Sequence, residues 1–481
     1  MSARLFGNYI DGAWVEGPTF DNVNPANTAE VVGRFVKGTP EDVARAAGAA
    51  QAALAGWAGM TGPARGALLY KVAEILDRNF DAVSADMTRE EGKTLAEAKG
   101  EVRRSINIFR YFAGEGARLA GVLAPSERER VHMFALRKPV GVCGLVTPWN
   151  FPSAIPAWKL APALICGNTV VLKPASAAPL SAWRIVEACH EAGIPKGVVN
   201  FVAGSGGALG EALVNAGPVK AISFTGSCGV GGWLHEQASK RRLRIQLEMG
   251  GKNPTIVLAD ADFNAAVENT VNGAFFSTGQ KCTATSRAIV EESIYDRFVE
   301  AVVERTKKLK VGDGMEAGTD IGPCVDRGQM ETVLRYIELG RKEAGEPLCG
   351  GRRLKEGGLE KGWFVEPAVF AGVTPEMTIA REEIFGPVLA IMKARDFKQA
   401  MEMANGSEFG LSASLQTSNV SRMYEYIYGI EAGLVTVNLP SAGVEYQLPF
   451  GGTKGSSFGP KEQGPAAMDF YSDYKTVYVK Y

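Results

Sequence analysis

One cysteine and one glutamate stand in settings that suit covalent and acid–base chemistry. Cys282 lies in a loop of small polar residues at 277–286 and follows Lys281, a setting that favours an accessible thiolate. Glu248 ends an apolar strand just before Gly250, and an apolar environment raises a carboxyl pKa toward that of a general base. Each residue also has a plainer interpretation, because cysteines are usually core residues and a strand-end glutamate is often structural. Both interpretations stay open at this point.

A second group of residues could hold a nucleotide. Residues 204–210 (GSGGALG) and 224–231 (FTGSCGVG) are two glycine-rich turns, each leading from a predicted strand into a helix. The first amide groups of such a helix are free to bind phosphate. Lys173 lies just past a third strand end, where its ammonium could reach a ribose or a phosphate. Each feature alone is equally typical of a tight turn or a solvated lysine. Three of them on one sheet edge favour a nucleotide site.

The histidines and cysteines argue against several other chemistries. The three histidines, His132, His190 and His235, occur in no HxxH or HExxH pattern, so a zinc hydrolase is not expected. No GxSxG elbow accompanies them, which argues against a serine hydrolase. The seven cysteines are odd in number and include no CxxC pair, so neither a disulfide framework nor a metal site is predicted. A reduced, cytoplasmic setting is favoured.

Length, charge and hydropathy narrow the class of protein further. The 481 residues carry a formal net charge of −1, so no nucleic acid is expected as a partner. No run of 18 apolar residues occurs, and the first residues lack the apolar core of a secretory signal, so no membrane segment is predicted. Residues 250–252 (GGK) are followed by Asn and lack P-loop spacing, which disfavours a kinase or NTPase.

The residues that could take part in catalysis or binding fall at the ends of predicted strands. After a hairpin at 6–15, helices are expected at 39–57, 63–78 and 95–118. Beyond residue 139, short β-branched runs alternate with helical segments, with strands at 140–146, 169–172, 198–202, 219–224 and 244–247 and helices at 156–166, 180–192, 208–215 and 230–239. This alternation predicts an α/β fold with a parallel sheet that is buried on both faces. Ligands bind beyond the carboxyl ends of such strands.

A second α/β region is expected from about residue 253 to 436. It begins with a strand at 255–258 and a helix at 263–277, and a glycine-rich loop is predicted at 448–459. The closing segment, 475–480, is predicted as an exposed strand that could pair with another subunit.

Seven segments, taken in order, resemble the motifs of the aldehyde dehydrogenase superfamily across essentially the whole chain. They are 147–152 (TPWNFP), 172–175 (LKPA), 224–227 (FTGS), 247–254 (LEMGGKNP), 279–282 (GQKC), 382–387 (EEIFGP) and 449–454 (PFGGTK). Within that superfamily, residues 277–287 (STGQKCTATSR) and 441–445 (SAGVE) resemble the α-ketoglutaric semialdehyde (2,5-dioxopentanoate) dehydrogenases. The resemblance implies NAD(P)-dependent oxidation of an aldehyde to a carboxylic acid.

The resemblance also implies a role for each motif residue. Cys282 would attack the aldehyde carbonyl, Asn150 and the Cys282 amide would stabilise the oxyanion, and Glu248 would activate the water that hydrolyses the thioester. Lys173 would hold the adenosine ribose and Glu383 the nicotinamide ribose. The full set implied in cofactor binding is Trp149, Lys173, Ser176, Gly206, Thr225, Gly226, Ser227, Glu383 and Phe385, and no metal is implied.

Ser176 departs from the pattern of NAD-preferring relatives, which often carry Glu at this position. A carboxylate there binds the ribose 2′-hydroxyl and repels a 2′-phosphate. Serine removes the repulsion, so either NADP or NAD is expected as cofactor.

A semialdehyde with a distal carboxylate needs a cationic or hydroxyl partner. Arg104, on a helix that borders the substrate tunnel in this family, is the predicted cation, and Ser441 or its loop is the predicted second partner. A surface salt bridge is the alternative for Arg104. Alternative substrates are succinic semialdehyde and neutral aliphatic or aromatic aldehydes. A CoA-acylating enzyme is disfavoured by Glu248, and a non-catalytic binding protein of the same fold by the intact Cys282, Glu248 and Asn150.

The expected architecture has three parts. Residues 1–119 and 142–249 would form a Rossmann-like cofactor domain, and residues 250–448 a second α/β catalytic domain. Residues 120–141 and 465–481 would form a small β bridging element. A homodimer or homotetramer is implied by the resemblance, and the C-terminal strand gives it a physical basis.

Overall fold

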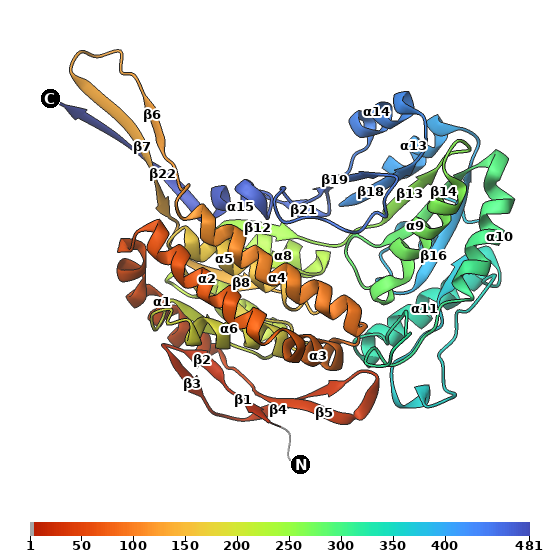
Figure 1. The fold of residues 1–481 in the computed structure, drawn as a ribbon, viewed down its shortest axis with the longest axis horizontal. Coiled ribbons are helices and arrows are strands. Elements are labelled where there is room, and N and C mark those ends of the chain that lie inside the picture. The colour runs from red at the N-terminus through yellow and green to blue at the C-terminus, as the bar shows by residue number, and fades with distance from the viewer. Residues whose placement is uncertain (1–3) are drawn as a thin grey trace.

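The structure, a computed structural model, describes residues 4–481, and its largest element is a sheet of eight strands (Figure 1). Five central strands run parallel, and antiparallel strands close both edges. In spatial order the strands are β21 (Ser457–Phe458), β12 (Arg244–Glu248), β11 (Val219–Thr225), β8 (Val142–Val146), β9 (Thr169–Lys173), β10 (Val199–Phe201), β2 (Asn8–Ile10) and β3 (Ala13–Val15). The Rossmann-like sheet expected from the alternating pattern is therefore confirmed.

Helices cover both faces of this sheet because its strands are apolar on both sides. They are α1 (Pro40–Gly59), α2 (Gly62–Arg78), α3 (Phe80–Glu91), α4 (Leu95–Glu115), α5 (Ala154–Ile165), α6 (Leu180–Glu191), α7 (Gly206–Asn215), α8 (Cys228–Lys240) and α15 (Gly464–Tyr471). Helix α1 begins with a capping box between Thr39 and Asp42, at the predicted position.

The second lobe contains a parallel sheet of six strands, seen on the right of Figure 1. In spatial order the strands are β15 (Ala368–Phe370), β16 (Val388–Ala394), β14 (Thr285–Glu291), β13 (Asn253–Val257), β18 (Ser412–Gln416) and β19 (Leu434–Val437). Its helices are α9 (Phe263–Phe275), α10 (Tyr295–Thr306), α11 (Arg327–Ala344), α12 (Thr378–Arg381), α13 (Phe397–Asn405) and α14 (Val420–Gly429). This lobe agrees with the predicted second α/β region.

A narrow three-stranded sheet projects from the first lobe (upper left in Figure 1). It consists of β6 (Val122–Ala124), β7 (Val131–Pro139) and β22 (Ser472–Lys480), with β22 antiparallel to β7 over its whole length. The predicted start of the C-terminal part of this element, residue 465, is too early. Residues 464–471 form α15, and its side chains, including Met468 and Phe470, lie in the core of the first lobe.

Several elements of the structure were absent from the sequence-based expectation. Helix α3 follows α2 directly and has no side-chain cap, so no local signal separates the two. Strands β4 (Thr19–Asn24) and β5 (Asn27–Val36) pair through two register shifts, which break the alternation that would predict them, and with β1 (Leu5–Phe6) they form a separate sheet. Strand β17 (Phe409–Gly410) pairs with β20 (Thr453–Lys454). Strand β20 lies within the segment 448–459, which was predicted to be a loop. No helix among residues 4–481 is long and apolar enough to cross a membrane.

Candidate active site

Two adjoining clefts lie at the carboxyl ends of strands β8, β9 and β11. The inner cleft, of about 280 Å³, is lined from both lobes by Trp149, Asn150, Thr225, Gly226, Ser227, Cys282, Gln329, Glu383 and Phe385, among others. The outer cleft, of about 590 Å³, is lined by Trp149, Lys173, Gly206, Glu211, Thr225, Gly226, Ser227, Val230 and Trp233, among others. Because the two share Trp149 and the turn at 225–227, one continuous channel leads from Lys173 to Cys282. It brings together ten of the residues predicted from sequence.

The loop that carries Cys282 is held on several sides. It follows three residues in left-handed conformation, of which Ser277 and Thr278 have φ of 55° and 57°. Glu97 on α4 accepts a 2.6 Å hydrogen bond from the Ser277 amide. The Asn253 side chain donates to the Cys282 carbonyl at 2.8 Å. These contacts hold a strained turn in place, so the sulfur has a defined position in the inner cleft.

The surroundings of the Cys282 thiol disfavour its ionised form. Burial, together with the negative charges of Glu383 and Glu248, raises the pKa of this thiol to about 12. Cys282 is half-buried and lines the inner cleft, and the polar sequence of its loop does not reveal the two carboxylates that the fold places nearby.

Asn150 is positioned by a buried ion pair that the sequence did not single out. The Lys93 ammonium donates to the Asn150 backbone carbonyl at 2.8 Å and to a Glu101 carboxylate oxygen at 2.6 Å. The other Glu101 oxygen accepts the amide hydrogens of Ser153 and Ala154 at 2.9 and 3.0 Å, at the start of α5. The backbone on both sides of the turn is thus fixed, and the Asn150 side chain is left to line the inner cleft.

Glu248 is fully buried behind the inner cleft. Its Oε2 accepts a 2.5 Å hydrogen bond from the Ser457 hydroxyl, while Oε1 has no partner among residues 4–481. A side chain at Gly451 would collide with Oε1, since a Cβ there would lie 2.5 Å from it. Burial and the neighbouring charge of Glu462 raise the pKa of Glu248 well above its usual range. The predicted direction of this shift is confirmed.

A buried lysine and glutamate adjoin this base, and the sequence-based analysis missed both. Lys159 on α5 pairs with Glu462 and donates to the Ser223 hydroxyl at 2.7 Å. Glu462 also accepts a 2.7 Å hydrogen bond from the Trp158 indole. One signal was available, because Lys159 is the only charged residue in the otherwise apolar helix α5, and buried charges are normally paired.

The outer cleft has the donors that a dinucleotide needs. Lys173 is 6% exposed, and its only hydrogen bond among residues 4–481 is to the Pro174 carbonyl at 2.9 Å. Burial lowers the pKa of Lys173 to about 8. Ser227 precedes α8 without capping it, so both its hydroxyl and the first amides of the helix are available. A Cβ on Gly206 would lie 3.9 Å from the Lys173 Nζ, so this glycine of the turn at 204–210 lies beside the lysine.

Ser176 lies next to the outer cleft rather than on it. Its neighbour Ala175 lines the cleft, and the Ser176 hydroxyl donates to the Gly204 carbonyl at 2.6 Å. On the inner cleft, Glu383 accepts a hydrogen bond from the Gly251 amide at 3.0 Å. Burial raises the pKa of Glu383 to about 7. The ring of Phe385 meets Trp149 edge to face at 5.3 Å, which gives the inner cleft an aromatic wall.

Residues 14–477 match the model of the aldehyde dehydrogenase family. The chain belongs to this family. It is 49% identical over 476 residues to an α-ketoglutaric semialdehyde dehydrogenase of Bacillus subtilis, with 98% of each chain covered. An α-ketoglutarate semialdehyde dehydrogenase of Haloferax volcanii is 43% identical, covering 98% of this chain and 99% of the relative. The crystal structure of a Staphylococcus aureus betaine aldehyde dehydrogenase in complex with NAD⁺ superposes with a TM-score of 0.96 at 33% identity, covering 98% of this chain and 94% of that one.

The two predicted substrate residues of this aldehyde dehydrogenase differ in what they can contact. Arg104 on α4 is half-buried, its Nε has no partner, and its Nη2 donates to the Gln463 side chain at 3.1 Å. It forms no ion pair with a carboxylate among residues 4–481, so the surface salt bridge considered as an alternative is absent there. Ser441 is 0% exposed, and its hydroxyl donates to the Thr283 carbonyl at 2.8 Å. The prediction that the Ser441 hydroxyl binds substrate is therefore wrong, because this hydroxyl holds the loop after the nucleophile instead.

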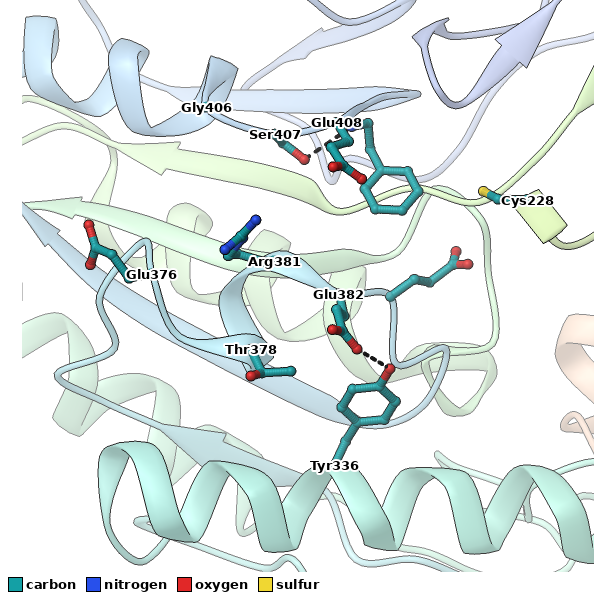
Figure 2. Close-up of a pocket in the computed structure, with 11 residues that line it drawn as sticks. Cys228, Tyr336, Glu376, Thr378, Arg381, Glu382, Gly406, Ser407 and Glu408 are labelled. Atoms are coloured by element: carbon teal, nitrogen blue, oxygen red, sulfur yellow. Dashed lines mark hydrogen bonds between the residues drawn. The ribbon is translucent and has the colours of Figure 1, made fainter. Parts of the chain in front are cut away.

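A third pocket, of about 730 Å³, shares the lining residue Glu383 with the inner cleft and is shown in Figure 2. Glu376, Glu382, Glu383 and Glu408 line it against a single cation, Arg381, and Glu382 accepts a 2.7 Å hydrogen bond from Tyr336. This excess of negative charge opposes the binding of a pyrophosphate in the third pocket. Among residues 4–481 no group of three or more His, Cys, Asp or Glu side chains could hold a metal ion.

Proposed function

We propose that this aldehyde dehydrogenase oxidises α-ketoglutaric semialdehyde to 2-oxoglutarate, with NAD⁺ or NADP⁺ as the oxidant. The observation that carries the substrate is Arg104, a half-buried guanidinium near the nucleophile that has no carboxylate partner among the described residues. A substrate with a carboxylate could pair with this guanidinium. The printed names of the Bacillus and Haloferax relatives support the same substrate.

The two clefts fit a nicotinamide dinucleotide. Lys173 and Ser227 would hold the adenosine ribose and the pyrophosphate, and Glu383 the second ribose, beside the aromatic wall of Trp149 and Phe385. The crystal structure of the Staphylococcus relative in complex with NAD⁺ supports this cofactor. When bound, the nicotinamide supplies the acceptor for the hydride that leaves the substrate carbon.

The protein groups then divide the chemistry into two stages. The Cys282 thiol releases its proton to solvent as the sulfur adds to the aldehyde carbonyl, and the Asn150 side chain and the Cys282 amide donate hydrogen bonds to the resulting oxyanion of the thiohemiacetal. Loss of hydride leaves a thioester on Cys282. Glu248 takes a proton from a water molecule that attacks this thioester, and the acid leaves as the thiol is restored. Ser457 holds Glu248 by one oxygen and leaves the other free for the water.

The substrate proposal is tested by Arg104→Ala. We expect KM for α-ketoglutaric semialdehyde to rise at least tenfold, while kcat/KM for propanal stays within twofold, because only the first substrate has a carboxylate. Initial rates of reduced-cofactor formation give both values. The matched control is Arg103→Ala on the same helix, because Arg103 pairs with Asp77 at 2.7 Å. An equal loss for both aldehydes would remove Arg104 from substrate recognition.

Cofactor choice is tested by Ser176→Glu. We propose that the wild-type enzyme accepts NADP⁺ as well as NAD⁺, because Ser176 presents no negative charge beside the outer cleft. The new carboxylate should lower kcat/KM with NADP⁺ at least tenfold by repelling the 2′-phosphate, and change the value with NAD⁺ little. Ser176→Ala controls for loss of the hydroxyl. A wild-type enzyme that ignores NADP⁺, or an equal loss with both cofactors, would contradict the proposal.

We further propose that the chain forms a homodimer or homotetramer through the projecting sheet. Its strands carry exposed apolar side chains, among them Leu123, Tyr478 and Val479. A single chain has no core against which to bury them, whereas a second copy would cover them. Light scattering on the full chain should give the mass of two or four copies. The mass of one copy would contradict the assembly.

A further inference from the structure

We propose that Gln463 forms, together with Arg104, a two-donor site for the distal carboxylate of the substrate and is a specificity-determining residue of this enzyme. This inference rests on the proposed substrate class, an aldehyde whose far end is a carboxylate. Gln463 is 0% exposed and lies between Glu462 and the start of α15. None of the motifs that resemble the aldehyde dehydrogenases includes it.

Each of the two side chains has a buried nitrogen without a hydrogen-bond partner among residues 4–481. The Arg104 Nη2 donates to the Gln463 Oε1 at 3.1 Å, so the amide oxygen is used and Nε2 faces elsewhere. That Nε2 is buried and has no partner among residues 4–481, and the same holds for the Arg104 Nε. Buried donors are nearly always satisfied in folded proteins. Two unsatisfied donors on adjoining side chains therefore indicate a ligand with acceptor atoms.

The backbone of Gln463 supports a role beyond packing. Its φ of 58° and ψ of 171° lie in a region that residues other than glycine rarely adopt. The neighbouring chain holds this conformation, because the Gly464 amide donates to the Tyr446 carbonyl at 2.9 Å and the Ala467 amide to the Gln463 carbonyl at 3.2 Å. A large polar side chain is thus kept in a strained position where glycine would be relaxed. The Gln463 side-chain amide contacts Arg104, and a glycine at this position would have no such group.

The donor pair lies near the reacting sulfur. The Arg104 guanidinium lies 5.5 Å from the centre of the Trp158 ring, which packs against Phe450 at 5.4 Å. Trp158 donates to Glu462, the residue before Gln463 and a neighbour of the base Glu248. Burial lowers the pKa of Arg104, and the nearby carboxylate of Glu101 and the Cys282 side chain oppose this shift. Arg104 is thus in contact with Gln463 and within electrostatic range of the nucleophile.

This chemistry selects a carboxylate over an uncharged chain end. A carboxylate has two oxygens that can each accept a hydrogen bond, one from the cationic Nε of Arg104 and one from the neutral Nε2 of Gln463. A neutral aldehyde such as pentanal would leave both donors buried and unpaired. Sites that lose a hydrogen-bond partner in this way discriminate more strongly than apolar pockets do. Gln463 would also orient the guanidinium through its Oε1, so the two residues act as one unit.

The test compares Gln463→Leu, Gln463→Met and Gln463→Glu with the wild-type enzyme. We expect Gln463→Leu and Gln463→Met to raise KM for α-ketoglutaric semialdehyde at least tenfold and to keep kcat/KM for pentanal within threefold. Gln463→Glu should lose more with the semialdehyde, because its carboxylate occupies Arg104 and repels the substrate. The double variant Arg104→Ala/Gln463→Leu should lose less than the product of the two single effects.

Ligand binding gives a readout that does not depend on turnover. Glutarate, a dicarboxylate of the same length, should raise the melting temperature of the wild-type protein and not that of Gln463→Leu, while NAD⁺ should raise both. Equal losses with the semialdehyde and pentanal, or an unchanged response to glutarate, would overturn the site. If the wild-type enzyme shows no preference for the semialdehyde over pentanal, the proposed substrate fails. If that preference exists and Gln463→Leu keeps it, only the role of Gln463 fails.

Discussion

Replacing Cys282 by alanine is expected to lower kcat/KM for aldehyde oxidation by at least about 10⁴-fold. The thiohemiacetal and the thioester both form on this sulfur, and no other cysteine lines the inner cleft. Initial rates of reduced-cofactor formation measure the effect, while quenching of tryptophan fluorescence by NAD⁺ reports binding. Because Trp149 and the outer cleft are untouched, binding of the cofactor should survive the substitution.

Cys349→Ala is the matched control for this experiment. Cys349 is another half-buried thiol, but it pairs with Val369 in the second lobe and lines neither cleft. The variant should retain full activity and lose at most a little thermal stability. A Cys282→Ala enzyme that oxidises aldehydes within tenfold of the wild-type rate would remove the covalent mechanism altogether.

Replacing Glu248 by glutamine should separate the two stages of the reaction. Glutamine keeps the shape of the side chain and can accept the Ser457 hydrogen bond, but it cannot take a proton from water. We expect steady-state turnover to fall by about 10²–10⁴-fold. A rapid first burst of about one reduced cofactor per active site should remain, because the thioester still forms. Stopped-flow absorbance measures the burst, and a loss of burst and turnover together would place Glu248 in the first stage instead.

The raised pKa of Glu248 sets the sign of the pH dependence. The carboxyl must lose its proton to act as a base, so hydrolysis of the thioester should speed up as pH rises through this raised pKa. An unfolded glutamate loses its proton near pH 4.3, whereas the buried one retains it to higher pH, so this group destabilises the fold as pH rises above about 4.3. Glu248→Gln removes that penalty. Its melting temperature at pH 8 should therefore not fall below that of the wild type, and Glu376→Gln, on the exposed side of the acidic pocket, is the control for loss of a carboxylate.

Most residues of the outer cleft could be predicted from the sequence, because the motifs that contain them are short and local. A strand, a glycine-rich turn and a helix follow one another within about twenty residues, and parallel strands bring their carboxyl ends to one sheet edge. Lys173, Ser227 and Gly206 line one cleft for this reason. Strands β4 and β5 were not predicted because register shifts interrupt their alternation of apolar and polar residues. Helix α3 was not predicted because no side-chain cap marks its start.

The substrate side could not be read in the same way, because its residues meet only through long-range contacts. Arg104 and Gln463 are 359 positions apart, and each looks like an ordinary polar residue in its own segment. The Ser441 hydroxyl lay in a segment shared with semialdehyde dehydrogenases, yet its direction depends on where the Thr283 carbonyl lies across the fold. Sequence patterns report which residue types occur together, whereas the direction of a side chain follows from packing.

The residue types and their order predicted the α/β fold, and the resemblance to the aldehyde dehydrogenases implied Cys282 as the nucleophile, Glu248 as the base and Asn150 as the oxyanion residue. Each of these depends on a chemical group and on a short stretch of backbone that positions it. The protonation of Cys282 and Glu248, the clamp of Lys93 and Glu101 on the Asn150 turn, and the pairing of Arg104 with Gln463 came only from the tertiary structure. Burial and the charges of distant segments control these properties, and both exist only once the chain has folded.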